Sequence, residues 1–309
     1  MKIDANSVTF EPQDMAFVKK FGILEATEMA LDYHAEHPNL PFLYDAEQLA
    51  GFLGISRGEL NDIVNHIQKE YKEAHLPKKD GTYRSLCVPS IRLRFCQDPI
   101  KEKILPQLPV SKFATAYQKG STTRGNAEPH IGKKFLLKLD ITDFFGSITF
   151  EQVQRTAFNT RYVSRQVGYL LTSLCCKDDS LPQGAATSPA LSNIVMYRFD
   201  DYIGRWCSQR QIAYTRYCDD MTFSANRPLY GVYQKVKTML REMGFELNES
   251  KTHFIGNDNR QSVTGLVVNE KLSIPSGYKR DLRQEVYYAL KFGVEDSVLH
   301  GHRSDFVED

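Results

Sequence analysis

The chain has little of what would place it in a membrane or outside the cell. No stretch of its 309 residues reaches the ~20 consecutive apolar residues that a membrane-spanning helix needs. The opening residues, MKIDANSVTF, lack the basic end and apolar run of a secretory signal. The six cysteines form no Cys-x-x-Cys pair and have no histidines at zinc-binding spacing. These absences predict a soluble, cytoplasmic protein with free thiols, no zinc site and no membrane partner.

The chain also lacks a large net charge, but its charges are distributed unevenly. The net charge is +1, yet residues 1–70 carry 5 basic against 12 acidic side chains, a balance of −7. Residues 71–138 carry 14 basic against 5 acidic side chains, a balance of +9. Such a basic region is expected where a protein contacts a phosphate backbone, although a solvated surface could have the same charges. Its cations include Lys78, Lys79, Arg84, Arg92, Arg94, Lys119, Arg124, Lys133 and Lys134.

The first 64 residues contain no chemistry that the sequence identifies, and the role of residues 1–44 stays open. A composition of 41% hydrophobic and 25% charged residues is typical of a globular protein with two or three subdomains around one core. Residues 1–44 are predicted to form an acidic, helical N-terminal extension. Residues 45–64 have the periodicity and central glycine of a helix-turn-helix. Because the second of these helices is acidic, a structural helical hairpin is favoured over a DNA-reading one.

Two adjacent aspartates are predicted to lie at a hairpin tip. Residues 211–216 and 221–225 are short segments rich in aromatic and β-branched residues, a pattern typical of strands. Between them, Tyr217-Cys218-Asp219-Asp220 predicts a tight turn that holds two carboxylates side by side. An ordinary polar turn could have the same sequence.

A third aspartate is predicted to lie at the edge of a neighbouring strand. Residues 135–141 alternate in polarity, which directs Asp140 away from the apolar face. Two carboxylates about 4 Å apart repel by ~4 kcal/mol at an effective dielectric of about 20, and a divalent cation relieves that repulsion. Two Mg²⁺ ions roughly 4 Å apart would activate an attacking hydroxyl and stabilise a leaving pyrophosphate. Asp140, Asp219 and Asp220 are therefore candidate ligands for two Mg²⁺ ions.

Two other segments have residue types suited to a nucleotide. Residues 76–89 predict a basic hairpin with an Asp-Gly turn, whose cations could reach a triphosphate, and Arg84 could bind it through its planar fork. Phe145 follows Asp140 by five residues, so its ring could close over a sugar and exclude a 2′-hydroxyl by bulk. Phe145 could equally be a core residue, since Phe144 precedes it.

A loop that leads into a helix is the last candidate segment. Residues 181–189 predict a helix start with Ser188 as N-cap and Pro189 in the first turn. Apolar residues then recur at three- and four-residue steps as far as Trp206, so the helix should bury one face. Gln183 and Gly184 would then lie near a substrate, because glycine permits close approach of the backbone.

The order of these segments resembles that of the reverse transcriptases. The similar segments are LPKKDGTYR, KLDITDFF, LPQGAATSPALSN, YCDD and GFELNESKT. Two more segments resemble the bacterial retron branch of that family: Asn126-Ala127-Glu128-Pro129-His130 is similar to its Asn-Ala-x-x-His motif, and Val263-Thr264-Gly265 to its Val-Thr-Gly motif. The resemblance covers roughly residues 45–285.

The resemblance implies an α+β right-hand polymerase fold. Residues 45–138 would form most of the fingers. Residues 139–268 would form the palm, with an antiparallel sheet, helices and inserted finger helices at about 150–180. Residues 269–309 would form a short thumb with one helix from Lys279 to Phe292.

The resemblance also implies roles for individual residues. The catalytic residues would be Asp140, Asp219, Asp220 and Lys251, with Asp140 and Asp219 as the more direct ligands of both metal ions and Lys251 protonating pyrophosphate. The nucleotide-binding residues would be Lys79, Arg84, Phe145, Gln183, Gly184 and Tyr217. The RNA-binding residues would be Asn126, His130, Val263, Thr264 and Gly265. Without the resemblance, Asn126 and His130 are more simply explained as a helix cap and a surface imidazole.

The implied function is that of a retron RNA-directed DNA polymerase. Such an enzyme uses dNTPs and a cognate structured non-coding RNA, and starts from the 2′-hydroxyl of an internal guanosine to make branched multicopy single-stranded DNA. The resemblance further implies an anti-phage defence system with an accessory effector protein. Two alternatives are a group II intron or diversity-generating reverse transcriptase, and a non-catalytic RNA-binding scaffold of the same shape.

Two departures from the family pattern qualify the resemblance. Cys218 stands where most retron enzymes have alanine, a small change that could alter fidelity or sensitivity to oxidation. The region after Asn269 is also shorter than the family's usual helical thumb. Template grip, product length or RNA selectivity could therefore depend on a partner.

Overall fold

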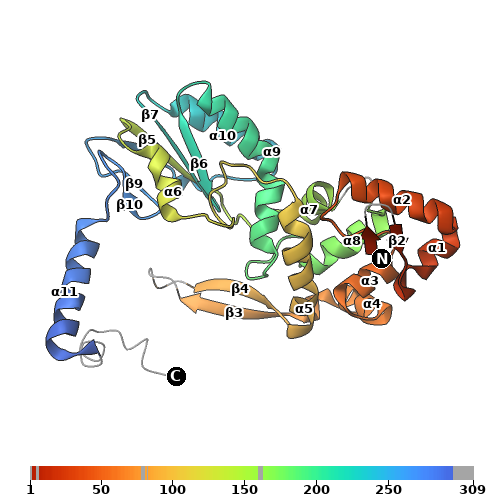
Figure 1. Ribbon diagram of the computed structural model, residues 1–309. Helices are drawn as coiled ribbons and strands as arrows, with labels where there is room; N and C mark the ends of the chain where they lie inside the picture. The colour runs from red at the N-terminus through yellow and green to blue at the C-terminus, as the bar shows by residue number, and fades with distance from the viewer. Residues whose placement is uncertain (1, 5–6, 78–80, 82, 159–162, 295–309) are drawn as a thin grey trace.

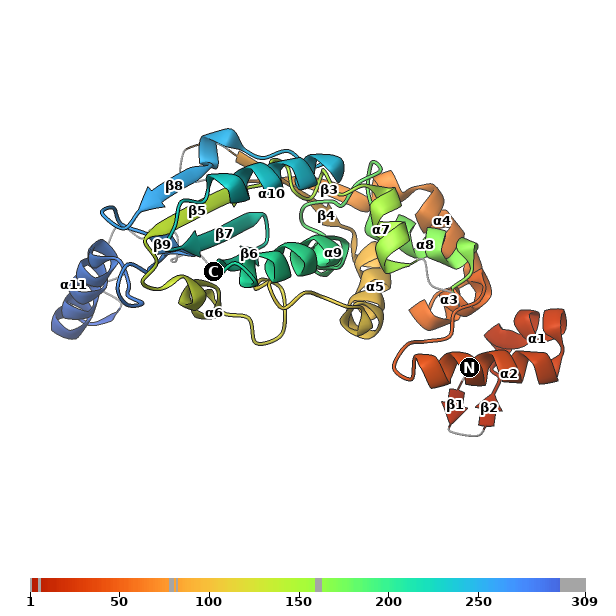
Figure 2. The same ribbon diagram turned by 90° about the horizontal axis from the view of Figure 1, so that it is seen from above.

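The computed structural model describes residues 2–4, 7–77, 81, 83–158 and 163–294. The molecule is elongated (Figure 1), with the N-terminal helices at one end and helix α11 at the other. A four-stranded sheet and its helices lie between these ends, as the view from above also shows (Figure 2).

The N-terminal residues form a small unit with its own apolar cluster. Strands β1 (Lys2–Asp4) and β2 (Ser7–Thr9) pair antiparallel, and helices α1 (Met15–Phe21) and α2 (Ile23–Glu36) follow. The rings of Phe17, Tyr33 and Phe42 are buried together beneath these elements. The two helices occupy about half of the predicted helical extension, and the hairpin before them was not predicted.

Helices α3 (Ala46–Leu53) and α4 (Arg57–Asn65) form the predicted helical hairpin. The Ser56 side chain caps α4 by accepting from the backbone of Glu59, and Gly54 ends α3 with a φ of +75° that favours glycine. Both helices bury their apolar faces in the main core. This burial agrees with a structural role for the pair.

A long two-stranded hairpin extends beside the central sheet (Figure 1). It consists of β3 (Tyr71–Pro77) and β4 (Tyr83–Pro89), antiparallel, with Leu76 opposite Arg84. Helix α5 (Ile91–Pro99) follows and is capped by the Ser90 hydroxyl. A five-residue π-helical segment then continues over Ile100–Ile104.

The central sheet has the strand order β6-β7-β5-β8 and is antiparallel throughout. Its strands are β6 (Ala213–Tyr217), β7 (Asp220–Ala225), β5 (Phe135–Asp140) and β8 (His253–Gly256). On one face, Leu137, Leu139 and Phe223 pack into the main core together with helices α9 (Ser188–Ser208) and α10 (Tyr230–Glu242).

The other face of the sheet is also covered. Helix α6 (Thr123–Ala127) and a short hairpin of β9 (Ser262–Val263) and β10 (Leu266–Val267) lie over it. Leu136, which alternates with Leu137 along β5, is buried there against Ala127, Val263 and Val268. The sheet is therefore a middle layer rather than a surface.

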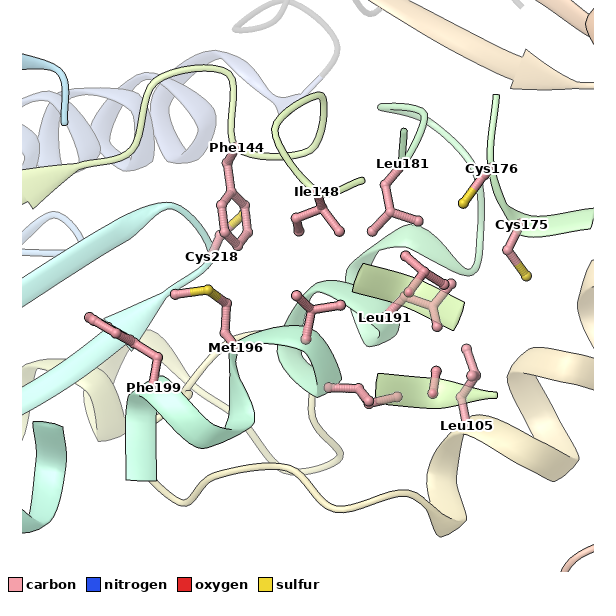
Figure 3. Packing of buried hydrophobic residues seen from close by; sticks show 14 of the residues in the cluster. Leu105, Phe144, Ile148, Cys175, Cys176, Leu181, Leu191, Met196, Phe199 and Cys218 are labelled. Carbon is pink, nitrogen blue, oxygen red and sulfur yellow. The ribbon is translucent and has the colours of Figure 1, made fainter. Parts of the chain in front are cut away.

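Helices α7 (Phe150–Ala157) and α8 (Arg165–Cys175) join the core next to α9. Figure 3 shows Phe144, Cys218 and Met196 lying together, close to Ile148, Leu181 and Leu191. These side chains come from the chain after β5, the β6–β7 turn, the 181–189 loop and α9. Packing thus brings together segments that are far apart in the sequence.

The predicted N-cap of α9 is wrong. Ser188 is the first helical residue, and its buried hydroxyl donates to the Pro182 carbonyl at 2.7 Å instead of accepting from the helix backbone. Pro189 does lie in the first turn, as predicted. The serine therefore closes the 181–189 loop onto itself.

The C-terminal helix α11 (Ser276–Phe292) begins three residues before the predicted Lys279. None of its residues is buried. Across the described residues, no helix combines the length and apolar character required to cross a membrane. All six cysteines are described, and all are free thiols.

Candidate active site

The three aspartates predicted to bind metal lie at one end of two adjacent strands. Asp140 ends β5 and is the register partner of Asp220, the first residue of β7. Tyr217 pairs with Asp220 across the β6–β7 hairpin, so Cys218 and Asp219 form a two-residue turn. Cys218 has a φ of +62°, the left-handed conformation that such turns require. The tight turn and the neighbouring strand were both predicted correctly.

The electrostatics of this strand end reflect crowded negative charge. The pKa of Asp220 is raised, mainly because neighbouring groups partly desolvate its carboxylate. The negative charges of Asp219 and Asp140 raise this pKa further. Lys138 and Lys251 act in the opposite direction. The Asp220 residue as a whole is exposed. Its carboxylate nevertheless lies close to the carboxylates of Asp219 and Asp140.

Lys251 lies directly at the carboxylates. Its Nζ donates to Asp140 Oδ2 at 3.0 Å, and this contact raises the pKa of Lys251. Asp140 is 5% exposed, whereas the Lys251 side chain is 59% exposed. A buried acceptor thus holds an accessible ammonium group at the edge of the site.

The donor set fits a hard divalent cation in chemical type. Asp140, Asp219 and Asp220 offer carboxylate oxygens, which Mg²⁺ prefers, and their mutual repulsion contributes to the raised Asp220 pKa. Within the described ranges, no group of three or more His, Cys, Asp or Glu side chains is close enough to hold one ion. Lys251 instead occupies one oxygen of Asp140. Ion binding would therefore require these side chains to reorient.

A buried ion pair holds the turn between β6 and β7 in place. Arg216, the residue before Tyr217, is fully buried, and its Nη2 donates to Asp200 Oδ2 of α9 at 2.6 Å. The same guanidinium donates from Nη1 to the Cys218 carbonyl at 2.8 Å and from Nη2 to Asn193 Oδ1 at 3.0 Å. Arg216 thus ties the turn that carries Asp219 to helix α9.

This network was not predicted from the sequence, although a signal was present. Asn193 and Asp200 are polar residues within the apolar stripe of α9, and both are buried. A charged residue on a buried helix face needs an opposite charge, because an unpaired buried charge is costly. Arg216, which is buried in strand β6, is that partner.

Tyr117 is a second unpredicted neighbour of the turn. Its hydroxyl donates to Cys218 Sγ at 3.1 Å, and the residue itself is 49% exposed. Burial raises the pKa of the Cys218 thiol to about 12, so the thiol stays protonated at neutral pH. The Cys218 side chain therefore has a specific contact with Tyr117.

The two phenylalanines after Asp140 have different environments. Phe144 is buried in the main core, whereas Phe145 is only partly buried, and their ring centroids are 5.5 Å apart. Phe145 is therefore the accessible one of the two. Tyr217 is also partly buried and packs against the same core.

The loop with Gln183 and Gly184 is fixed to the basic hairpin. The Cys87 amide of β4 donates to the Gln183 carbonyl at 2.7 Å. A Cβ at Gly184, where φ is +120°, would lie 2.9 Å from the Cys87 carbonyl oxygen. A side chain at position 184 would collide with Cys87, so glycine is needed for the loop to lie this close to β4. Arg84 is an exposed residue of β4, and Lys79 lies outside the described residues.

Most of the residues predicted to bind RNA in the two retron-like motifs lie inside the molecule. Asn126, His130 and Val263 are at most 1% exposed, so their side chains do not reach the surface. His130 is therefore not a surface imidazole, and Asn126 is not a helix cap. Thr264 and Gly265 lie at the β9–β10 turn, where Thr264 is partly buried and Gly265 is exposed.

These buried residues connect the covering layer to the sheet. His130 Nδ1 and Nε2 lie 2.7 Å from Ser224 Oγ and 2.9 Å from Thr215 Oγ1, and burial lowers the pKa of His130 to about 3. Asn126 Nδ2 donates to Thr264 Oγ1 at 3.4 Å. The two motifs therefore contact each other and hold α6 and the β9–β10 hairpin on the central sheet.

Comparisons with known proteins show the family of the chain. Residues 76–268 match the family model described as reverse transcriptase (RNA-dependent DNA polymerase). The chain is 34% identical over 233 residues to the retron Ec83 reverse transcriptase of Escherichia coli, covering 70% of this chain and 75% of that protein. It is 28% identical over 270 residues to the retron Ec86 reverse transcriptase of the same organism, covering 86% and 84%.

Among solved structures, a telomerase from Candida albicans aligns with a TM-score of 0.47 and 13% identity. The alignment covers 73% of this chain and about half, 52%, of that one. The family match and the curated relatives are the stronger findings. The chain belongs to the reverse transcriptase family and, within it, to the retron-type enzymes. It is an RNA-directed DNA polymerase with the right-hand polymerase fold.

Proposed function

We propose that this polymerase copies its cognate structured retron RNA, starting from the 2′-hydroxyl of an internal guanosine, into branched multicopy single-stranded DNA. It would act in the cytoplasm on dNTPs, as part of an anti-phage defence system with an accessory effector protein. The identity to two retron enzymes over most of the chain supports the RNA partner. The register pairing of Asp140 with Asp220, beside Asp219, is the observation that carries the catalytic part.

Asp140, Asp219 and Asp220 are the proposed catalytic carboxylates. They would hold two Mg²⁺ ions, which would supply Lewis-acid stabilisation of the phosphoryl group and lower the pKa of the attacking hydroxyl. Lys251 Nζ, which donates to Asp140 Oδ2, would give a proton to the leaving pyrophosphate. Arg216 keeps the turn in place while these charges change.

The nucleotide would lie between the carboxylates and the basic hairpin. Lys79 and Arg84 would bind the triphosphate, and Phe145 would exclude a 2′-hydroxyl by bulk. Gln183 and Gly184 would line the nucleotide site next to Tyr217. The backbone hydrogen bond from Cys87 to Gln183 supports a shared nucleotide site, because it joins the basic hairpin to the loop.

The proposed division of the chain follows from these roles. Residues 45–138 would form most of the fingers, residues 139–268 the palm with finger helices inserted at about 150–180, and residues 269–309 the short thumb. Thr264 and Gly265 would contact RNA at the surface. Asn126, His130 and Val263 would position that surface from within.

The test is to express the protein with its flanking genomic RNA and separate the co-purifying nucleic acid on a denaturing gel. We expect a discrete DNase-sensitive band that RNase shortens. After alkaline hydrolysis, two ribonucleotides, the branch guanosine and its 3′ neighbour, should stay attached to the DNA if synthesis starts from a 2′-hydroxyl, because the branch nucleotide has no free 2′-hydroxyl to cleave its own 3′ linkage. Asp219→Asn should abolish the band, a loss of at least about 10³-fold, because the carboxylate ligand is removed.

The matched control is Asp281→Asn, which removes one carboxylate from the exposed helix α11. It should leave the DNA band unchanged. Bound RNA without DNA in every sample would favour a non-catalytic scaffold. Efficient use of generic primed templates, with indifference to the flanking RNA, would favour a group II intron or diversity-generating type.

A further inference from the structure

The outer face of helices α9 and α10 combines aromatic and basic side chains. Arg198, Tyr202, Arg205 and Trp206 follow one another at helical spacing along α9, and Lys235 projects beside them from α10. We call these residues, together with Arg210, the outer palm face. Figures 1 and 2 show the two helices on the same side of the sheet. Trp206 is the single tryptophan of the chain.

Cations on this face lie against aromatic rings. The Arg210 guanidinium lies 4.4 Å from the Trp206 ring centroid. Lys235 Nζ lies 5.0 Å from the ring centroid of Tyr202 and 5.3 Å from that of Trp206. Lys235 Nζ also donates to the Tyr202 hydroxyl at 3.2 Å. These contacts hold positive charge at defined positions beside partly exposed rings.

The surface is hollowed where these side chains meet. Two adjacent hollows of about 580 and 600 Å³ share Tyr202 as a lining residue. Four cations line them, against two carboxylates, Asp201 and Glu242. Asp201 is already paired with Arg205. The balance of charge therefore favours an anionic occupant.

The outer palm face is separated from the catalytic carboxylates by the sheet. Leu137 and Leu139 of β5 point toward the layer of α9 and α10, whereas Asp140 alternates to the opposite face. A ligand on the outer palm face would therefore not be the template strand at the active site. It would belong to another part of a larger molecule.

We propose that the outer palm face binds a single-stranded segment of the enzyme's RNA that lies outside the template. Arginine and lysine would contact phosphates, and bases would stack on Tyr202 and on the guanidinium plane above Trp206. This inference rests on the proposed function for the identity of the RNA. It adds a second contact site, which holds the RNA while the template moves through the active site.

Trp206 provides a direct measurement, because no other tryptophan contributes to the signal. Fluorescence excited at the tryptophan band is recorded while a 12-nucleotide oligo(rU) or the transcript of the flanking DNA is added to the full-length protein. We expect quenching that saturates with RNA binding measured separately by filter retention. Binding of either RNA with unchanged Trp206 fluorescence would overturn the inference.

A charge variant tests the face independently. Arg198→Gln/Arg210→Gln/Lys235→Gln removes three cations from it. The matched control, Arg57→Gln/Lys69→Gln/Arg155→Gln, removes three exposed cations elsewhere in the chain. We expect about tenfold weaker RNA binding for the first variant only. The slope of log affinity against log salt should fall by about 2, since each phosphate of a single strand that a cation neutralises contributes about 0.7 to it.

The polymerase reaction separates this inference from the proposed function. With saturating flanking RNA, both triple variants should reach the wild-type maximal rate of DNA synthesis, because the catalytic carboxylates are untouched. Equal RNA affinity for the two variants would reject the outer palm face as a binding site while leaving the retron function intact. Absence of DNA synthesis and of RNA binding by the wild-type protein would reject both.

Discussion

The central sheet and helix α11 differ in which side chains they bury. In the sheet, even polar residues are enclosed: Arg216 is fully buried and paired with the equally buried Asp200 of α9. In α11, even large apolar residues are open, with Leu282 at 44% and Leu290 at 83% exposed. The side chains of the sheet are enclosed by contacts with other parts of the chain. Helix α11 contributes almost no packing to the described part of the molecule.

The sheet is the part of the enzyme whose side chains are held in place before a substrate binds, and α11 is not. The Asp219 turn is tied to α9 through Arg216 and to the loop before α6 through Tyr117. Catalytic groups held in this way lose little order when a substrate binds. Ring contacts within α11, such as Tyr288 with Phe292, stay inside the helix. Stability and catalysis should therefore respond strongly to changes in the sheet and weakly to changes in α11.

The largest effect is expected from breaking the buried ion pair. Arg216→Ala should lower the free energy of unfolding by about 3–5 kcal/mol, because Asp200 is left as an uncompensated buried charge. Arg280→Ala, whose exposed partner is Asp281, should change it by less than about 0.5 kcal/mol. Urea denaturation followed by circular dichroism measures both. Equal losses for the two variants would contradict the contrast between sheet and helix.

The same contrast applies to apolar side chains. Leu240→Ala removes a fully buried side chain of α10 and should cost about 2–5 kcal/mol of unfolding free energy. Leu282→Ala makes the identical change on α11 and should cost less than about 0.5 kcal/mol. Both values come from the same denaturation experiment. A large cost for Leu282→Ala in the isolated protein would show that α11 packs against the body in solution.

The smallest expected effect is a pH dependence that originates at His130. Its folded-state pKa, about 3, lies below the ordinary value of about 6.5, so the unfolded chain binds the proton more tightly. Stability is therefore fully present above about pH 6.5 and falls as the pH decreases toward 3. The loss attributable to His130 should be about 2 kcal/mol between pH 7 and pH 5.

Removing the imidazole checks this origin. His130→Gln should flatten the dependence of unfolding free energy on pH between 7 and 5, although it also lowers stability at pH 7 by disturbing bonds to Ser224 and Thr215. His253→Gln, an exposed position on β8, is the control and should keep the wild-type slope. An unchanged slope in His130→Gln would mean that another group titrates.

Much of the sheet and its catalytic turn could be predicted because their signals are local. Alternation along residues 135–141 and a two-residue turn between aromatic, β-branched segments depend only on neighbouring residues. The predicted N-cap at Ser188 was wrong, and so were the simpler explanations of Asn126 as a helix cap and His130 as a surface imidazole, for a shared reason. Their side chains bond to groups whose position depends on packing, such as the Pro182 carbonyl and Thr215.

The order of motifs, the family and the strand end that carries Asp140, Asp219 and Asp220 can all be read from the amino-acid sequence. Which polar residues are enclosed and which face outward follows only from the assembled fold. Arg216 meets Asp200 because β6 crosses α9, and the outer palm face forms because α9 lies beside α10. Burial is a property of the packed layers, and no local pattern specifies which distant segment will cover a given side chain.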